Sequence, residues 1–222
     1  MRSAVETLAH RLLVTETAPL EALREAAAAG ALFAVIDSCD EPSVLAKVEE
    51  AGPERVVSLY RGEAEEDFAD FAPYLFRVDA ELLDWIAAEL WPKPWGIFAR
   101  AALPLEDVRK QFRRFLLVED PDGMEMYFRF YDPRILRVFL PTCTASELSQ
   151  FFGPIEAMGV GATDAPEVTW YAPARSVPRD LAIPDEPEPL PATPSAVETP
   201  HAHDHGDPCE CGCERPKRRW VR

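Results

Sequence analysis

The sequence has no apolar run long enough to cross a membrane. No stretch approaches the ~18 consecutive apolar residues that suggest a transmembrane helix. Near its start, the acidic Glu6 stands where a secretory signal peptide would build its apolar centre. These absences predict a cytoplasmic protein with no membrane partner.

The sequence also lacks a cysteine framework. It contains 5 cysteines, of which Cys39 and Cys143 are far apart and the others crowd together near the end. A small secreted domain held by disulfides would space its cysteines in pairs along the fold. The cysteine pattern therefore agrees with a cytoplasmic location.

Basic residues are few relative to acidic residues. The chain has 23 lysine and arginine residues against 39 aspartate and glutamate residues, for a formal net charge of −16. Proteins that bind nucleic acid neutralise its phosphates with a basic surface. The charge argues against nucleic acid as the main partner and favours a basic or mixed-charge protein.

Common catalytic motifs are missing as well. The sequence has no Gly-x-Ser-x-Gly elbow and no phosphate-binding glycine-rich loop, and His10 is its only histidine before residue 201. The turn Asp37–Asp40 follows a predicted strand, at the place where α/β sheets often carry catalysis. Nothing nearby in the sequence supplies a base for Cys39 or Ser38, so we predict that the protein is not an enzyme.

Predicted strands and helices alternate along the first half of the chain. Apolar runs bounded by turns predict strands at 31–36, 56–60, 75–78 and 95–100. Helical spacing and helix-ending glycines predict helices at 4–14, 20–29 and 80–90, one that opens near Pro42, and one after Pro104 that carries Phe112. This order predicts an α/β fold with flanking helices around a mixed sheet that has at least one antiparallel edge.

A hairpin is predicted around the turn at residues 120–123. Pro121 suits the first central position of a type I turn, and Gly123 can adopt the left-handed conformation that closes a bulged hairpin. Residues 115–118 should therefore pair antiparallel with residues 126–131. Asp132 is then a predicted helix cap and Pro133 a first-turn residue, so 134–140 should form a short helix.

Strand alternation assigns the hairpin side chains to two faces. Phe128 and Phe130 would share the core face, leaving Arg129 between two tyrosines on the other. Arg129 could stack on a phenol and offer its guanidinium to a partner. We favour an internal ion pair with Asp132 that holds the strand to the helix, because structural ion pairs use the same residue types as recognition sites.

Basic residues recur on the helix that carries Phe112. They form i, i+4 pairs that would lie on its outer face and could select an acidic partner surface. The alternative is a solvated face paired with Glu106 or Asp107. The predicted patch consists of Arg109, Lys110, Arg113 and Arg114, extended by Arg134 and Arg137.

The C-terminal third has a different composition. A capping box at 144–147 opens a last predicted helix that ends at Gly153. Residues 161–222 contain 11 of the 22 prolines and little periodic apolar content. The sequence thus predicts a folded domain at 1–160 and a flexible, disordered, Pro-rich tail at 161–222.

The end of this predicted tail carries imidazoles and thiols at alternate positions. Such side chains bind zinc, copper(I) or nickel, and alternate residues of an extended chain can close on one ion. The spacing matches no paired Cys-x-x-Cys site, so a low-complexity segment without a metal role is the alternative. The candidate ligands are His201, His203, His205, Cys209, Cys211 and Cys213.

Several short motifs resemble those of a bacterial family of type VI secretion effector adaptors, known as domain of unknown function 4123. The signature of that family is an aromatic-Arg-aromatic-Tyr-Asp-Pro-Arg run, which this chain carries at residues 128–134. The resemblance extends over about 30–155. Its other motifs are 32–37, Ser58-Leu59-Tyr60, 72–75, 95–98, Arg113-Arg114-Phe115 and 151–154.

The resemblance implies a cytoplasmic adaptor that is not an enzyme and needs no cofactor. Such a protein would bind a toxin effector and load it onto a spike protein of the VgrG type. The predicted signature or partner-binding residues are Arg113, Arg114, Arg129, Tyr131, Asp132, Arg134 and Arg137. The alternative is a metal-handling accessory protein that uses the His/Cys end.

Overall fold

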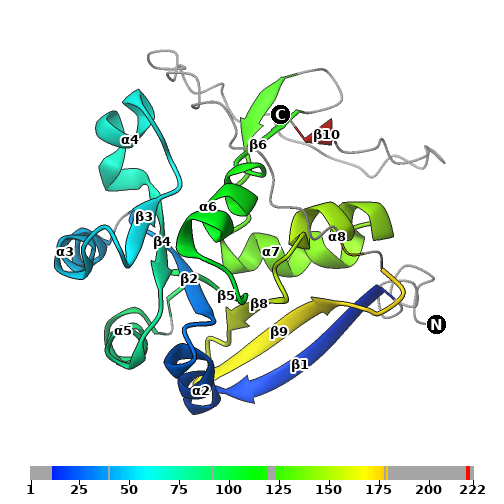
Figure 1. Ribbon diagram of the computed structural model, residues 1–222, viewed down its shortest axis with the longest axis horizontal. Helices are drawn as coiled ribbons and strands as arrows, with labels where there is room; N and C mark the ends of the chain where they lie inside the picture. Colours follow the sequence, from blue (N-terminus) through cyan, green and yellow to red (C-terminus); the bar gives the residue numbers. More distant parts are fainter. Residues whose placement is uncertain are drawn as a thin grey trace, which may run out of the picture.

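A seven-stranded sheet lies at the centre of the fold (Figure 1). The computed structural model describes residues 12–39, 41–91, 93–119, 124–177, 179 and, for the backbone alone, 219–220. All the described strand pairs of the sheet are antiparallel. In spatial order the strands are β1 (Leu13–Pro19), β9 (Glu167–Pro173), β8 (Ala157–Gly161), β5 (Gly96–Arg100), β2 (Leu32–Asp37), β4 (Pro73–Arg77) and β3 (Val56–Ser58).

The sheet differs from the expected mixed sheet because none of its described neighbouring strands are parallel. The path of the chain explains this difference. Helix α3 (Pro42–Ala51) connects β2 to β3, and these two strands run in the same direction but are not neighbours. Strand β4 lies between them and runs the opposite way. In the same way, β2 lies between β4 and β5, which α5 (Ala80–Trp85) connects. Each of these helices therefore connects two parallel strands that are not neighbours in the sheet.

Helices cover both faces of the sheet, which confirms the predicted α/β class with flanking helices (Figure 1). Helices α2 (Leu23–Ala28), α3 (Pro42–Ala51) and α5 (Ala80–Trp85) contribute to one core, and α6 (Leu105–Arg113), α7 (Pro133–Phe139) and α8 (Ala145–Phe152) to the other. The short α4 (Glu63–Asp67) follows β3, and single turns occur at Leu20–Ala22, Ala69–Phe71, Ile86–Leu90 and Leu140–Thr142. No helix within the described ranges combines the length and apolarity needed to cross a membrane.

Strand β2 is buried on both of its faces. Phe33 and Val35 belong to the core under α6, α7 and α8, whereas Leu32, Ala34 and Ile36 belong to the core under α2, α3 and α5. Successive side chains of a strand point to opposite faces, so a central strand covered twice needs an uninterrupted apolar run. This is the run that predicted a buried strand from the sequence.

The end of α8 is fixed by a contact with α6. The predicted capping box at Thr144 is present, and Gly153 ends the helix with a φ of 50°. The buried Gln111 amide of α6 donates to the carbonyls of Gln150 at 2.8 Å and Phe151 at 3.1 Å. These bonds satisfy carbonyls that a helix end leaves without a partner.

The predicted hairpin is confirmed, with shorter strands. Strand β6 (Leu117–Glu119) pairs with β7 (Glu125–Tyr127), and the register places Val118 opposite Met126. A short strand from the end of the chain, β10 (Arg219–Trp220), pairs with the other edge of β6 and completes a three-stranded sheet. This small sheet rises above α6 (Figure 1). The predicted turn at 120–123 lies outside the described residues.

The folded part extends beyond the predicted boundary at residue 160. Strand β9 lies inside the sheet between β1 and β8, and its Val168 and Trp170 are buried. Val177 is also buried, so the predicted tail begins too early. The proline content of 161–222 obscured a short alternation at 167–170, in which Val168 and Trp170 are buried and the residues between and before them are not.

The predicted N-terminal helix at 4–14 is also wrong at its end, because Leu13 already belongs to β1. The first part of that predicted helix lies outside the described residues.

Candidate functional site

The signature segment leaves the hairpin and turns into α7. Strand β7 ends at Tyr127, so the alternation predicted up to residue 131 does not apply to the whole segment. Phe130 is fully buried, as predicted, and its ring lies 5.4 Å from that of Phe112. Phe128 is half-buried and meets Phe139 edge to face at 4.7 Å. Tyr131 was predicted on the outer face but is buried as well.

Arg129 pairs with Asp37 and not with Asp132. The Arg129 guanidinium donates to the carboxylate of Asp37, at the end of β2. That carboxylate also accepts a hydrogen bond from the Cys39 backbone N–H at 3.2 Å. The predicted bracket between Arg129 and Asp132 is therefore wrong. The Arg129 side chain reaches back across the fold to a residue that the sheet brings beside it.

Asp132 caps α7 and binds Arg134 instead. Its carboxylate accepts from the Arg134 backbone N–H at 2.8 Å and from the Arg134 side chain at 2.6 Å. Burial opposes the charged form of Asp132, but these hydrogen bonds outweigh burial and lower the pKa of the carboxyl. The predicted cap is confirmed, and the ion pair is local to the helix start.

Three tyrosines surround the Asp37–Arg129 pair. The rings of Tyr60 and Tyr127 lie 6.1 Å apart, and the Arg129 guanidinium lies 5.8 Å from the Tyr131 ring centre. Burial raises the pKa of Tyr131, and its neighbours Tyr60 and Asp37 raise it further. Burial likewise raises the pKa of Tyr60. The phenols therefore stay protonated near neutral pH and serve as hydrogen-bonding and stacking groups.

The predicted basic patch on α6 is not a surface patch. Arg109 and Arg113 are buried and reach the end of β3 and the segment that follows it. Arg109 donates to the carbonyls of Ser58 at 2.8 Å and Tyr60 at 3.1 Å, and Arg113 donates to that of Leu59 at 2.7 Å. These arginines therefore brace the backbone that positions Tyr60.

The remaining basic residues are spread over separate places. Lys110 pairs with Asp107 at 3.3 Å, and the half-buried Arg114 lies over the Phe115 ring. Arg134 is exposed at the start of α7, whereas Arg137 donates to the carbonyl of Gly161 at the end of β8. The structure does not bring these side chains together into one positive surface.

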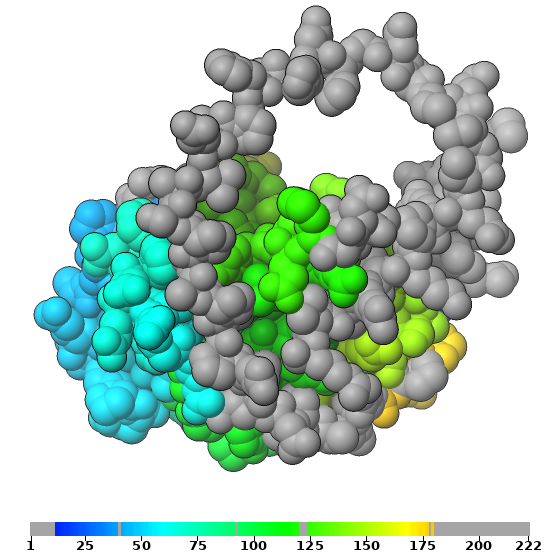
Figure 2. Space-filling model, turned by 90° about the horizontal axis from the view of Figure 1, so that it is seen from above, coloured from blue at the N-terminus to red at the C-terminus, as the bar shows by residue number. Residues whose placement is uncertain are grey.

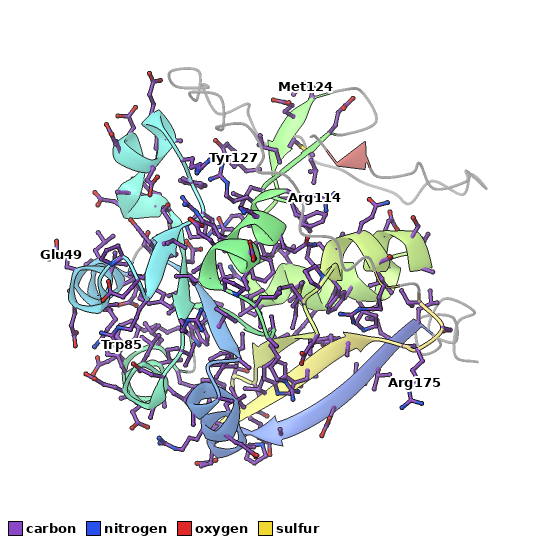
Figure 3. The ribbon with its side chains drawn as sticks, viewed as in Figure 1. Glu49, Trp85, Arg114, Met124, Tyr127 and Arg175 are labelled. Carbon is purple, nitrogen blue, oxygen red and sulfur yellow. The ribbon has the colours of Figure 1, made fainter. Side chains whose placement is uncertain are left out.

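The hairpin exposes large apolar side chains next to the tyrosine cluster. Met124, Met126 and Tyr127 are 64%, 46% and 44% exposed. Met124 lies near the hairpin tip, Tyr127 lies at its base on the side of α4, and Arg114 lies on the opposite side (Figure 3). Seen from above, green atoms of the part of the chain that includes the hairpin are exposed at the centre of the view, and the cyan atoms around α4 lie to their left (Figure 2).

We refer to Asp37, Tyr60, Tyr127, Arg129 and Tyr131, together with Met124 and Met126, as the hairpin surface. Sequence reasoning singled out Arg129 and Tyr131 for partner binding but gave no such role to Tyr60 or the methionines. Asp37 was considered only for catalysis. The Met-x-Met-Tyr run at 124–127 was a usable signal, because methionine and tyrosine are enriched at interfaces.

The candidate metal ligands all belong to one segment near the end of the sequence. His201, His203, His205, Cys209, Cys211 and Cys213 lie outside the described residues. Among the residues that the structure describes, no group of three or more His, Cys, Asp or Glu side chains could hold a metal ion.

A protein-family model, the domain of unknown function DUF4123, matches residues 32–150 of this chain. This match spans more than half of the 222 residues. The chain belongs to the DUF4123 family. The hairpin surface lies entirely within the DUF4123 segment, whereas β1, β8 and β9 lie outside it. No curated protein and no solved structure matches the chain.

The Arg129–Asp37 pair should contribute little to stability. The Arg129 side chain is 45% exposed, and the Asp37 side chain, at 12%, keeps the Cys39 backbone N–H as a second donor when Arg129 is removed. Water screens the pair from the arginine side, so its worth should be that of exposed ion pairs, about 0–1 kcal/mol. We therefore expect Arg129→Ala to lower the free energy of unfolding by less than about 1 kcal/mol in urea denaturation. A loss of several kcal/mol would show that the pair holds the fold together.

Proposed function

We propose that this DUF4123 protein is a cytoplasmic adaptor that binds a toxin effector of a type VI secretion system and loads it onto the spike protein. Its role is binding, and it has no catalytic activity of its own. The hairpin surface supports this proposal most directly, because two exposed methionines and the exposed Tyr127 lie near a partly exposed arginine within the segment that the family model matches.

The chemistry of the hairpin surface suits a protein partner. Tyrosine, methionine and arginine are enriched in interface cores, and arginine and tyrosine frequently dominate the binding energy. Met126 and Tyr127 present apolar area to solvent, while Arg129 retains an exposed portion of its guanidinium side chain beside Tyr131. A partner can bury the apolar groups and still reach a charged group at the edge.

The buried side of the cluster holds this surface in shape. Phe130 and Tyr131 are anchored in the core, and Arg109 and Arg113 hold the backbone around Tyr60. The side chains of a preformed surface lose less conformational entropy when a partner binds. The arrangement thus favours a binding site over a loop that orders only with its partner.

Met126→Glu tests the proposal. It places a charge in the middle of the exposed apolar face, and we expect the affinity for the cognate effector to fall at least about tenfold. Candidate effectors are the products of the genes that neighbour the gene of this chain, and their binding can be measured by isothermal titration calorimetry with the full-length protein.

The control is Phe71→Glu, because Phe71 is 56% exposed on a different element. It introduces the same charge and should leave effector binding unchanged. Equal binding by wild type and Met126→Glu, with both proteins folded, would place the effector site elsewhere on the molecule.

A further inference from the structure

The outer edge of β6 carries a strand from the far end of the chain. Arg219 pairs with Glu119, and Trp220 pairs with Val118, in antiparallel register. An uncovered strand edge exposes backbone N–H and C=O groups that readily pair with another strand. The occupant of this edge comes from a segment about 100 residues later in the sequence.

The register across the three strands separates charged from apolar positions. Glu119 lies opposite Glu125 on β7 and opposite Arg219 on β10. Val118 lies opposite Met126 on β7 and opposite Trp220 on β10. One row of the sheet thus has two acidic positions and one basic position, and the next row has three large apolar residue types.

Each row favours this particular occupant. Like charges directly opposite each other on neighbouring strands are destabilising, so the Glu119–Glu125 pair benefits from a basic residue at the third position. Opposite charges and aromatic–aliphatic neighbours in such rows contribute favourably. A third strand with an acidic residue opposite Glu119 would add a further repulsion.

The overall charge of the two segments is complementary as well. The hairpin and its turn contain Glu119, Asp120, Asp122 and Glu125. The last eight residues of the sequence, 215–222, contain four arginines and a lysine and no acidic residue. In a chain with a net charge of −16, such a basic segment is attracted to acidic surfaces of the same molecule.

We propose that the edge of β6 is a docking site for an extended segment in which a basic residue is followed by a large apolar one, and that the chain's own end around Arg219–Trp220 occupies it. The pairing is intramolecular and covers the β6 edge of the hairpin. Only two residue pairs hold it, so the segment exchanges with other strands of the same pattern. This inference concerns the chain alone and stands apart from the adaptor role.

Hydrogen–deuterium exchange on the full-length protein tests the proposal. Arg219→Glu should speed amide exchange in residues 117–119 about tenfold, because it replaces the favourable charge row with three acidic positions. The charge swap Arg219→Glu with Glu119→Arg should restore the slow exchange. Arg222→Glu changes the charge of the same segment outside the paired residues and should leave exchange in 117–119 unchanged.

Two further results would overturn the proposal. Exchange in residues 117–119 that is the same in wild type and Arg219→Glu would show that this end of the chain does not cover β6. A wild-type dimer in analytical ultracentrifugation that dissociates in Arg219→Glu would show that the segment docks on a second copy. The effector is absent from these experiments, so their outcome is independent of the Met126 test.

Discussion

A chain that ends at residue 160 should lose the cooperative unfolding transition of the full-length protein. It lacks β9, which lies between β1 and β8 and pairs with both. Without β9, β1 has no neighbour among the described strands, and the edge of β8 is uncovered. The cut therefore removes an inner strand of the sheet, and its effect differs from the loss of a loose tail.

The expected size of this effect follows from what β9 buries. Val168 and Trp170 are buried in the core under α2, α3 and α5, and the Trp170 ring lies 4.0 Å from the Arg100 guanidinium. Full burial of a large apolar side chain is worth about 1.5–3 kcal/mol. Loss of both side chains, together with their strand pairings, approaches the whole net stability of roughly 5–15 kcal/mol that domains have.

Thermal melting followed by circular dichroism measures this effect. The matched control ends at residue 179, which keeps β9 and Val177, and it should retain a cooperative transition close to that of the full-length protein. A chain ending at 160 with the same melting temperature as this control would mean that β9 adds nothing to the fold.

The second large effect is expected at Arg113. Its guanidinium donates to the Leu59 carbonyl at 2.7 Å, and its side chain is buried beneath the segment that carries Tyr60. Arg113→Ala leaves that carbonyl without this donor and also opens a cavity. Each of these changes costs on the order of 1–3 kcal/mol. We expect a total loss of about 3 kcal/mol in the free energy of unfolding.

Urea denaturation of two variants separates the causes of this loss. Arg113→Met fills much of the volume and should recover part of the stability, because only the hydrogen bond is then missing. The control is Arg114→Ala, which removes the neighbouring, half-buried arginine and should cost less than about 1 kcal/mol. Similar effects at positions 113 and 114 would contradict the distinction that the structure draws between them.

Local chemistry explains which features the sequence predicted well. The hairpin follows from a turn sequence, the start of α8 from its capping box, and the buried β2 from an apolar run. Each of these signals lies within a few residues of the element that it determines. The α/β class follows from the order of such elements.

The partner of Arg129 could not be predicted in this way. Asp37 lies 92 residues earlier in the chain, and the two meet only because the sheet and the hairpin place them together. The local candidate, Asp132, is taken by the helix start and Arg134. The short separation in sequence favoured an ion pair between Arg129 and Asp132, but in the fold Arg129 pairs with Asp37.

The burial of Arg109 and Arg113 also depends on tertiary structure. Both follow directly after buried apolar residues of α6, Val108 and Phe112, and so lie at the border of its apolar face. A border position is exposed on an isolated helix. Here the end of β3 and the segment after it supply carbonyl acceptors for both guanidinium groups.

The pairing of β1 with β9 sets the order in which the protein can complete its fold during synthesis. The ribosome makes β1 before β9, and about 150 residues separate the two strands along the chain. Until β9 is made, the strands of the family segment can assemble, but β1 has no strand to pair with. Strand β9 then fills the gap between β1 and the rest of the seven-stranded sheet. Strand β1 therefore stays unpaired while the residues between it and β9 are made, and an unpaired strand makes a nascent chain prone to aggregation.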